Sequence, residues 1–305
     1  MLHRTQRASR ACGALSPRHE LHRRSRHRLQ HLLAHLAQGV TGAKGGVDGD
    51  NQSMSAPPAP DSEHTLRRDL AAAYRLAARR GWDDIVWTHI SAALPDEPGH
   101  YLINRFGQRF CEITASSLVK VDSAGRVVDG SGARVNPSGF AIHGCVHAAR
   151  PDAVCVLHLH TLWGQALAAL PQGLLPCSQP ALRLVGRLGR HAYEGLAFTP
   201  AEQQRLVAAL STLDGVLLEN HGPLIVGRTV AEAFVLMHLL ERAAQVQLSV
   251  MAAMAGIGGQ PLLVPPEIIA LTQRQWAGPD NAPEGEDEWP ALLRSLQETD
   301  PDYDR

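Results

Sequence analysis

Cysteine, net charge and long apolar runs are all scarce in this chain of 305 residues. Its five cysteines show no paired spacing, which is typical of free thiols in a reducing compartment and predicts a cytoplasmic protein. The formal net charge of −1 argues against nucleic acid as the main partner. The longest apolar stretch, residues 235–255, is interrupted by His238, Glu241 and Arg242, so no membrane span is predicted. These absences leave a globular protein with a sizeable core.

Basic charge is concentrated at the start of the chain. Residues 1–53 hold nine Lys or Arg and three Asp or Glu, a net of +6, which leaves the rest of the chain at −7. Because this segment has no sustained apolar face, residues 1–60 are predicted to be a disordered basic extension. Three interpretations of this segment are open: translated sequence upstream of the true start codon, a disordered arm, or an arginine-rich transit peptide. The flexible composition from Met54 to Pro60 favours the first explanation.

Regular periodicity begins at residue 61 and predicts one α/β/α layered domain over residues 61–260. Residues 261–305 are predicted to form a tail with one short helix at 289–294. Strands are expected at 85–87, 90–94, 101–103, 117–121, 154–160, 216–218 and 224–226. Helices are expected at 62–80, 138–150, 162–170, 200–210 and 229–255, with Thr199 capping the fourth and Pro200 at its first position.

Three histidines are the most informative residues of the chain. His158 and His160 lie in the apolar run Val154–Thr161, and His221 follows in an Asn-His-Gly turn. Alternate residues of a strand share a face, so the first two imidazoles should lie roughly 7 Å apart on one side. A satisfied core histidine is the alternative for such a pair, but the carboxyl end of a strand is where α/β sheets bind ligands. Together the three predict a divalent metal site with an open position, zinc being the expected ion.

Longer motifs around these histidines resemble the class II aldolase/adducin family. Three stretches carry the resemblance, residues 150–161, 219–234 and 239–247, and it extends over about Leu66 to Gln247. It implies a three-layer α/β/α fold with a central mixed sheet, and metal ligands at His158, His160 and His221. It also implies a homotetramer with the active site at a subunit interface.

The sequence departs from the aldolases of this family at the substrate site. Their acid/base glutamate, near the start of the helix before the histidine strand, matches Gly139 here, as in the adducin-like branch that lacks it. Their phosphate pocket is poorly kept, so an unphosphorylated substrate is expected. Three pairs of residues form this pocket in the aldolases, and they match Thr88–His89, Phe106–Gly107 and Pro137–Ser138 here. The candidate substrate-binding residues are accordingly Ser138, Gly139 and Gly107.

Other polar residues have a functional and a structural interpretation each. His143, four residues before His147 on one helix, could help clamp a metal, but hydrogen bonding or packing behind the ligands is favoured. Glu219 is a candidate proton carrier beside the third ligand, although a salt-bridged side chain is the simpler interpretation. His191 and Tyr193 could reach a neighbouring site in an oligomer, by analogy with the family.

Two functions remain open. The first is a carbon–carbon lyase that acts on a small unphosphorylated hydroxy-carbonyl compound through a metal-stabilised enediolate. The second is a non-catalytic module like the adducin head, which binds a ligand or a protein such as a cytoskeletal partner. Three intact histidines favour the enzyme, and Gly139 favours the module. If the missing carboxylate limits aldol chemistry, Gly139→Glu should raise cleavage activity, and a helix start should tolerate the acidic side chain.

A chain that begins at Met54 should match the full-length protein in melting temperature and in metal content. Residues 1–53 contribute no recognisable core, so their removal should cost no stability. Thermal unfolding and metal analysis of the two purified proteins test this. A loss of several degrees in the shorter chain would show that the segment docks on the domain.

Overall fold

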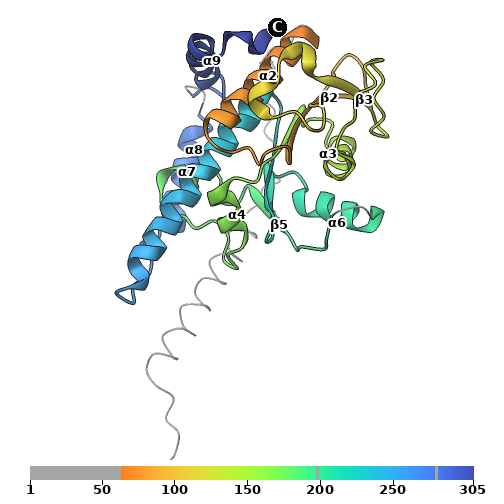
Figure 1. Cartoon of the computed structure of the whole chain (residues 1–305). Helices are drawn as coiled ribbons and strands as arrows, with labels where there is room; N and C mark the ends of the chain where they lie inside the picture. The colour runs from red at the N-terminus through yellow and green to blue at the C-terminus, as the bar shows by residue number, and fades with distance from the viewer. Residues whose placement is uncertain (1–62, 197–198, 279–280) are drawn as a thin grey trace, which may run out of the picture. The chain divides into compact units, whose positions relative to one another are not determined.

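A seven-stranded mixed sheet organises the computed structural model, which describes residues 63–196, 199–278 and 281–305 (Figure 1). The strand order is β3-β2-β1-β4-β7-β6-β5. All neighbouring strands are antiparallel except β5 and β6. The prediction for residues 1–60 lies outside the described residues. The strands are β1 His89–Ala93, β2 His100–Ile103, β3 Val119–Asp122, β4 Cys155–His158, β5 Leu188–His191, β6 Gly215–Leu218 and β7 Gly222–Gly227.

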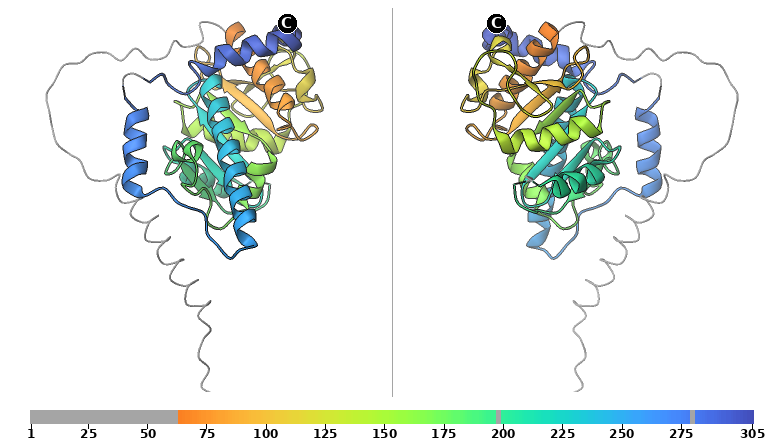
Figure 2. Two further views of the ribbon diagram at one scale, coloured as in Figure 1. Left: turned by 90° about the vertical axis from the view of Figure 1, so that its left-hand side faces the viewer. Right: turned by 90° about the vertical axis from the view of Figure 1, so that its right-hand side faces the viewer.

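Helices cover both faces of this sheet, which confirms the predicted α/β class with a central mixed sheet. Figure 2 shows α7 on one face and α3 with α6 on the other, in agreement with their packing partners. The main helices are α2 Glu63–Arg79, α3 Pro137–Ala149, α4 Leu162–Ala168, α6 Pro200–Leu210 and α7 Val230–Ala255. Shorter or later elements are α5 Gln179–Leu182, α8 Pro266–Trp276, α9 Glu288–Thr299 and the 3-10 turns Phe110–Glu112, Ala115–Ser117 and Pro301–Asp304.

The central strand β4 divides the core between these layers. Leu157 packs with residues of α2 and α7, whereas Val156 packs with Val146 of α3 and Leu206 of α6. All four side chains are essentially inaccessible to solvent. Successive strand residues point to opposite faces, so His158 shares the face of Val156. The first metal-ligand candidate therefore lies on the side of the sheet covered by α3 and α6.

Polar residues fix the starts of the helices that border this face. The Asn136 side chain accepts a hydrogen bond from the Ser138 backbone N–H and caps α3, whose first residue is Pro137. Thr199 caps α6 by accepting from the backbone N–H of Glu202, as predicted. Each cap satisfies a backbone donor that the first helical turn leaves unpaired. The start of α3, where Gly139 lies, is thus held in one conformation.

Several expected elements differ in the structure. Residues 85–87 form a turn rather than a strand, and β4 ends at His158 instead of continuing to residue 160. The strand β5 was missed because it is short, contains Gly189 and Arg190, and is only half-buried at the sheet edge. Within the described residues no helix is both long and apolar enough to cross a membrane.

The C-terminal segment is more structured than the predicted tail. It contains α8 and α9, and the second is longer than the expected helix at 289–294. Trp289, Leu296 and Tyr303 are buried in the same core as α2 and α7. The last residue also takes part, since the Arg305 carbonyl accepts a hydrogen bond from the Ser116 backbone N–H, 2.7 Å away.

Leu296→Ala should destabilise the whole domain by about 2–5 kcal/mol, the usual range for a fully buried leucine. Leu262→Ala is the matched control, because that side chain is 88% exposed. Urea unfolding followed by circular dichroism measures both. Equal unfolding midpoints for the two variants would show that α9 does not belong to the core in solution.

Candidate metal centre and active site

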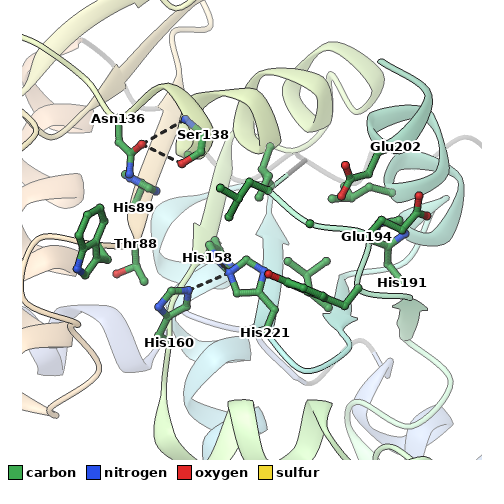
Figure 3. A pocket seen from close by; sticks show the side chains of 18 of the residues that line it. Thr88, His89, Asn136, Ser138, His158, His160, His191, Glu194, Glu202 and His221 are labelled. Atoms are coloured by element: carbon green, nitrogen blue, oxygen red, sulfur yellow. Dashed lines mark hydrogen bonds between the residues drawn. The ribbon is translucent and has the colours of Figure 1, made fainter. Parts of the chain in front are cut away.

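Three imidazole side chains converge at the end of β4 (Figure 3). His158 ends the strand, His160 lies in the loop before α4, and His221 lies in the turn between β6 and β7. His221 Nε2 is 3.2 Å from His158 Nε2 and 3.0 Å from His160 Nε2. One ligand atom from each ring lies within 4.8 Å of those of the other two. The three predicted ligands are therefore brought together.

The turn that carries His221 has a specific backbone. Asn220 has a φ of 55°, in the left-handed region that asparagine tolerates better than most residues. The His221 backbone N–H donates to the Leu218 carbonyl at 3.0 Å and closes the turn. Because β7 pairs with β4, this turn lies beside the end of the histidine strand. The Asn-His-Gly sequence thus places an imidazole opposite His158.

Contacts at Nδ1 orient two of the rings. His158 Nδ1 is 3.1 Å from the Pro223 carbonyl oxygen, and His160 Nδ1 is 2.9 Å from Asp84 Oδ2. Both partners are acceptors, so each Nδ1 carries the proton and each Nε2 presents a lone pair. His160 reaches this position from the loop, which replaces the predicted arrangement of two parallel side chains on one strand face.

These lone pairs are suited to a cation. The two Nε2 atoms flank His221 Nε2, and a single proton on that atom could satisfy one of them but not both. Burial and the neighbouring imidazoles hold the pKa of His158 well below its usual value, and they lower the pKa of His221 to about 4. Neutral imidazoles are the form that binds metal. The donor set therefore fits a divalent ion, with three nitrogen ligands and room for a further one.

Asp84 is a residue of the candidate site that the sequence analysis missed. Its carboxylate orients His160 in the carboxylate–histidine arrangement that is common at metal sites. The signal was weak, because Asp84 follows Asp83 in a polar turn far from the histidine motif in sequence. The antiparallel pairing of β1 with β4 brings this turn to the site.

A pocket of about 240 Å³ opens next to the three histidines. Its walls come from the segment before β1, the start of α3, the chain after β5 and the start of α6. None of the described residues that line it is Lys or Arg, whereas two are glutamates. The lining residues are Trp87, Thr88, His89, Asn136, Ser138, Gly139, Ile142, His158, His160, His191, Ala192, Tyr193, Glu194, Gly195, Leu196, Glu202, Leu206, Leu218 and His221.

Some of the other candidate residues line the pocket and others do not. Ser138 and Gly139 line the pocket, but Gly107 lies in a turn and does not. Glu219 is likewise absent from the lining and forms an ion pair with Arg190, 2.8 Å apart. Tyr193 lines the pocket of its own chain, with its ring centroid 6.3 Å from that of His221. Its neighbour His191 lines the same pocket.

His143 takes part in a buried hydrogen-bonded chain behind the pocket. Its Nδ1 is 2.6 Å from Ser91 Oγ, and that hydroxyl is also 2.8 Å from His147 Nε2. His147 Nδ1 contacts the Ala153 carbonyl at 3.1 Å. Burial lowers the pKa of His147 to about 4 and that of His143 well below its usual value. Both rings are thus neutral hydrogen-bonding groups, and His143 bonds to Ser91 rather than to one of the three candidate ligands.

The expectation that the fold tolerates Gly139→Glu is wrong. A Cβ atom at residue 139 would lie 2.0 Å from Cε1 of His89 and 2.3 Å from its Nδ1. His89 is 4% exposed, so its ring would have to move within a packed interior. The single substitution therefore displaces a pocket residue as well as adding a carboxylate.

Comparisons with known proteins agree with this architecture. Residues 68–248 match the class II aldolase and adducin N-terminal domain. The chain belongs to this family. A crystal structure of an aldolase II superfamily protein from Pseudomonas syringae is 42% identical, with a TM-score of 0.75, over 80% of this chain and 97% of that one.

Two further relatives represent the two branches of the family. An L-fuculose 1-phosphate aldolase from Glaciozyma antarctica is 27% identical, with a TM-score of 0.70, over 81% of this chain and 96% of that one. Rat α-adducin is 39% identical over 244 residues, which are 77% of this chain and 33% of that protein. The family includes enzymes and adducins, so membership alone does not decide the activity.

Asp84→Asn should weaken metal binding by about 10- to 100-fold, because the amide accepts a weaker hydrogen bond from His160 and no longer stabilises its orientation. Competition with a chromophoric chelator measures the affinity. Asp83→Asn is the matched control, since it removes the adjacent carboxylate and leaves the contact with His160 in place. Wild-type affinity in Asp84→Asn would contradict the orienting role.

Proposed function

We propose that this protein is a divalent-metal-dependent lyase of the aldolase type, acting on a small unphosphorylated hydroxy-carbonyl compound. The observation that carries the proposal is the convergence of His158, His160 and His221 next to a pocket. A divalent ion held there, zinc being the expected one, supplies a Lewis acid that polarises a carbonyl or hydroxyl oxygen. The protein contributes neutral, pre-oriented imidazoles and a pocket of limited size.

The charge of the pocket supports an unphosphorylated substrate. A phosphate group calls for cationic or multiple N–H partners, and no described lining residue is Lys or Arg. The nearby cations of β5 and α6 are already paired, Arg190 with Glu219 and Arg205 with Glu194. The relative from Glaciozyma antarctica is named for a phosphorylated sugar, so the two proteins would differ in substrate class.

The size of the pocket limits the substrate further. A volume of about 240 Å³ accommodates a compound of a few carbon atoms together with a metal ion. The polar groups around it, from Thr88, His89, Asn136 and Ser138, are neutral hydrogen-bonding groups that suit hydroxyls and carbonyls. A short hydroxy-aldehyde or hydroxy-ketone satisfies both conditions.

A binding module of the adducin-head type is the second candidate. Gly139 supplies no carboxylate where the family's aldolases are expected to have one, and similarity to rat α-adducin is substantial. In this alternative the metal site binds a ligand without turning it over. Either function is compatible with a homotetramer, which stays a prediction based on the family resemblance.

The wild-type protein should copurify with roughly one divalent ion per chain, and His158→Ala and His221→Ala should lose most of it, because two imidazoles hold a metal much more weakly than three. Elemental analysis measures the content, with His100→Ala on β2 as the control outside the site. The metal-loaded wild type is then screened for aldol cleavage of unphosphorylated hydroxy-carbonyl compounds.

Metal content and cleavage activity together distinguish the lyase from the binding module. Equal metal content in the wild type and both histidine variants would overturn the metal site. A metal-loaded protein without cleavage activity across the screen would exclude the lyase and favour the binding module.

A further inference from the structure

The segment that leads into β1 forms one wall of the pocket and has an unusual backbone. Thr88 has a φ of 73°, in the left-handed region, which is costly for a β-branched residue. Its Oγ1 atom is buried and has no hydrogen-bond partner among the described residues. Strained conformations of this kind concentrate at functional sites. The conformation sets the direction in which the next residue, His89, enters the strand.

His89 is polar and buried, and its ring nitrogens form no hydrogen bond with the described residues. The side chain lines the pocket, yet neither Nδ1 nor Nε2 has a hydrogen-bond partner among the described residues. Buried polar atoms are rarely left unpaired, because desolvation without a new hydrogen bond is unfavourable. Two unpaired ring nitrogens in the wall of a pocket point to a ligand that completes them.

The ring of His89 occupies the space of a side chain on residue 139. A Cβ atom there would lie within 2.0 to 2.5 Å of three ring atoms of His89. Glycine at 139 is therefore required for the position of this imidazole, since any other residue would overlap it. Histidine at 89 and a side chain at 139 exclude one another.

A hydrogen-bonded chain behind His89 has a defined direction. His147 Nδ1 donates to the Ala153 carbonyl, so His147 Nε2 accepts from the Ser91 hydroxyl. The Ser91 oxygen then accepts from His143 Nδ1, which leaves His143 Nε2 as an acceptor. That atom is buried without a partner among the described residues, and its ring packs edge-on against His89 at 5.7 Å between centroids. The part of the site behind the pocket thus contains an unpaired acceptor on His143 beside the unpaired ring nitrogens of His89.

We propose that His89 is the side chain that hydrogen-bonds a substrate hydroxyl beside the three-histidine site, in the place that a side chain on residue 139 would otherwise fill. The assignment rests on the proposed metal-dependent function, and it names the residue that determines which substrates are bound. The ligand class is a compound that binds the metal through two oxygens and carries a further hydroxyl on the adjoining carbon. His89 distinguishes this hydroxyl from a methyl group, because only the hydroxyl satisfies its ring nitrogen.

Two hydroxamates test the assignment. Glycolohydroxamate and acetohydroxamate chelate a metal through the same two oxygens, and only the first carries a hydroxyl on the adjoining carbon. Calorimetric titration of the zinc-loaded full chain should give glycolohydroxamate about three- to tenfold tighter binding, the effect of one hydrogen bond. His89→Ala should bind both compounds equally. His64→Ala, at an exposed position of α2, is the control and should keep the wild-type preference.

The outcomes separate this assignment from the proposed function. Equal affinity of the wild type for the two compounds, or an unchanged preference in His89→Ala, would overturn the role of His89 and leave the metal site standing. Binding of neither compound would overturn the metal-dependent function, and the assignment would fall with it.

A double-mutant cycle of melting temperatures tests, without any ligand, whether His89 and a side chain at 139 would occupy the same space. Gly139→Ala adds a methyl group that collides with the His89 ring, so it should lower the melting temperature of the wild type. In the His89→Ala background the same change should raise the melting temperature, because alanine is the better helix former inside α3. The same sign in both backgrounds would show that the two residues do not compete for one space.

Discussion

The convergence of three ring nitrogens is the constraint on which the rest of the site depends. His221 Nε2 lies about 3 Å from both His158 Nε2 and His160 Nε2, and the opposite edges of the His158 and His160 rings are held by acceptors. One acceptor, Pro223, belongs to β7, and the other, Asp84, precedes β1. These strands flank β4 on its two sides. The strand order of the sheet therefore determines which nitrogen is protonated in the imidazoles of His158 and His160.

The long helix α7 stabilises the same region from the other layer. Glu241 accepts a hydrogen bond from the Gly164 backbone N–H at 2.7 Å, close to the start of α4 and four residues after His160. Gln247 accepts from the Leu175 N–H and donates to the Gly173 carbonyl, both at 2.8 Å. Buried polar side chains of α7 thus pair backbone groups of the first turn of α4 and of the loop that follows α4. This explains why a mostly apolar helix contains these polar residues at buried positions.

Much of the fold and the metal ligands could be predicted from the sequence, because both depend on local patterns. The periodicity of α2 and α7 and the His-x-His run are readable within short windows. The places of Asp84 and His89 beside the three histidines could not be found in this way, since they depend on the pairing of β1 with β4. The helix at 289–294 was predicted, but the full length of α9 and its packing were not, because its few apolar residues can be assigned to the core only once the surfaces of α2 and α7 are known.

The His89 ring and a side chain at residue 139 would occupy the same space. This limits the order in which mutations can replace the glycine–histidine pair with a carboxylate at 139. A carboxylate introduced at 139 meets an imidazole that already fills its volume, so that step alone displaces a neighbour. Losing the imidazole first leaves a site with neither group. The effect of a substitution at either position therefore depends on the residue at the other position. This is sign epistasis, and it arises because the two side chains would overlap. A site with the glycine–histidine pair and a site with a carboxylate at 139 are therefore separated by a single-substitution intermediate in which one group is missing or displaced.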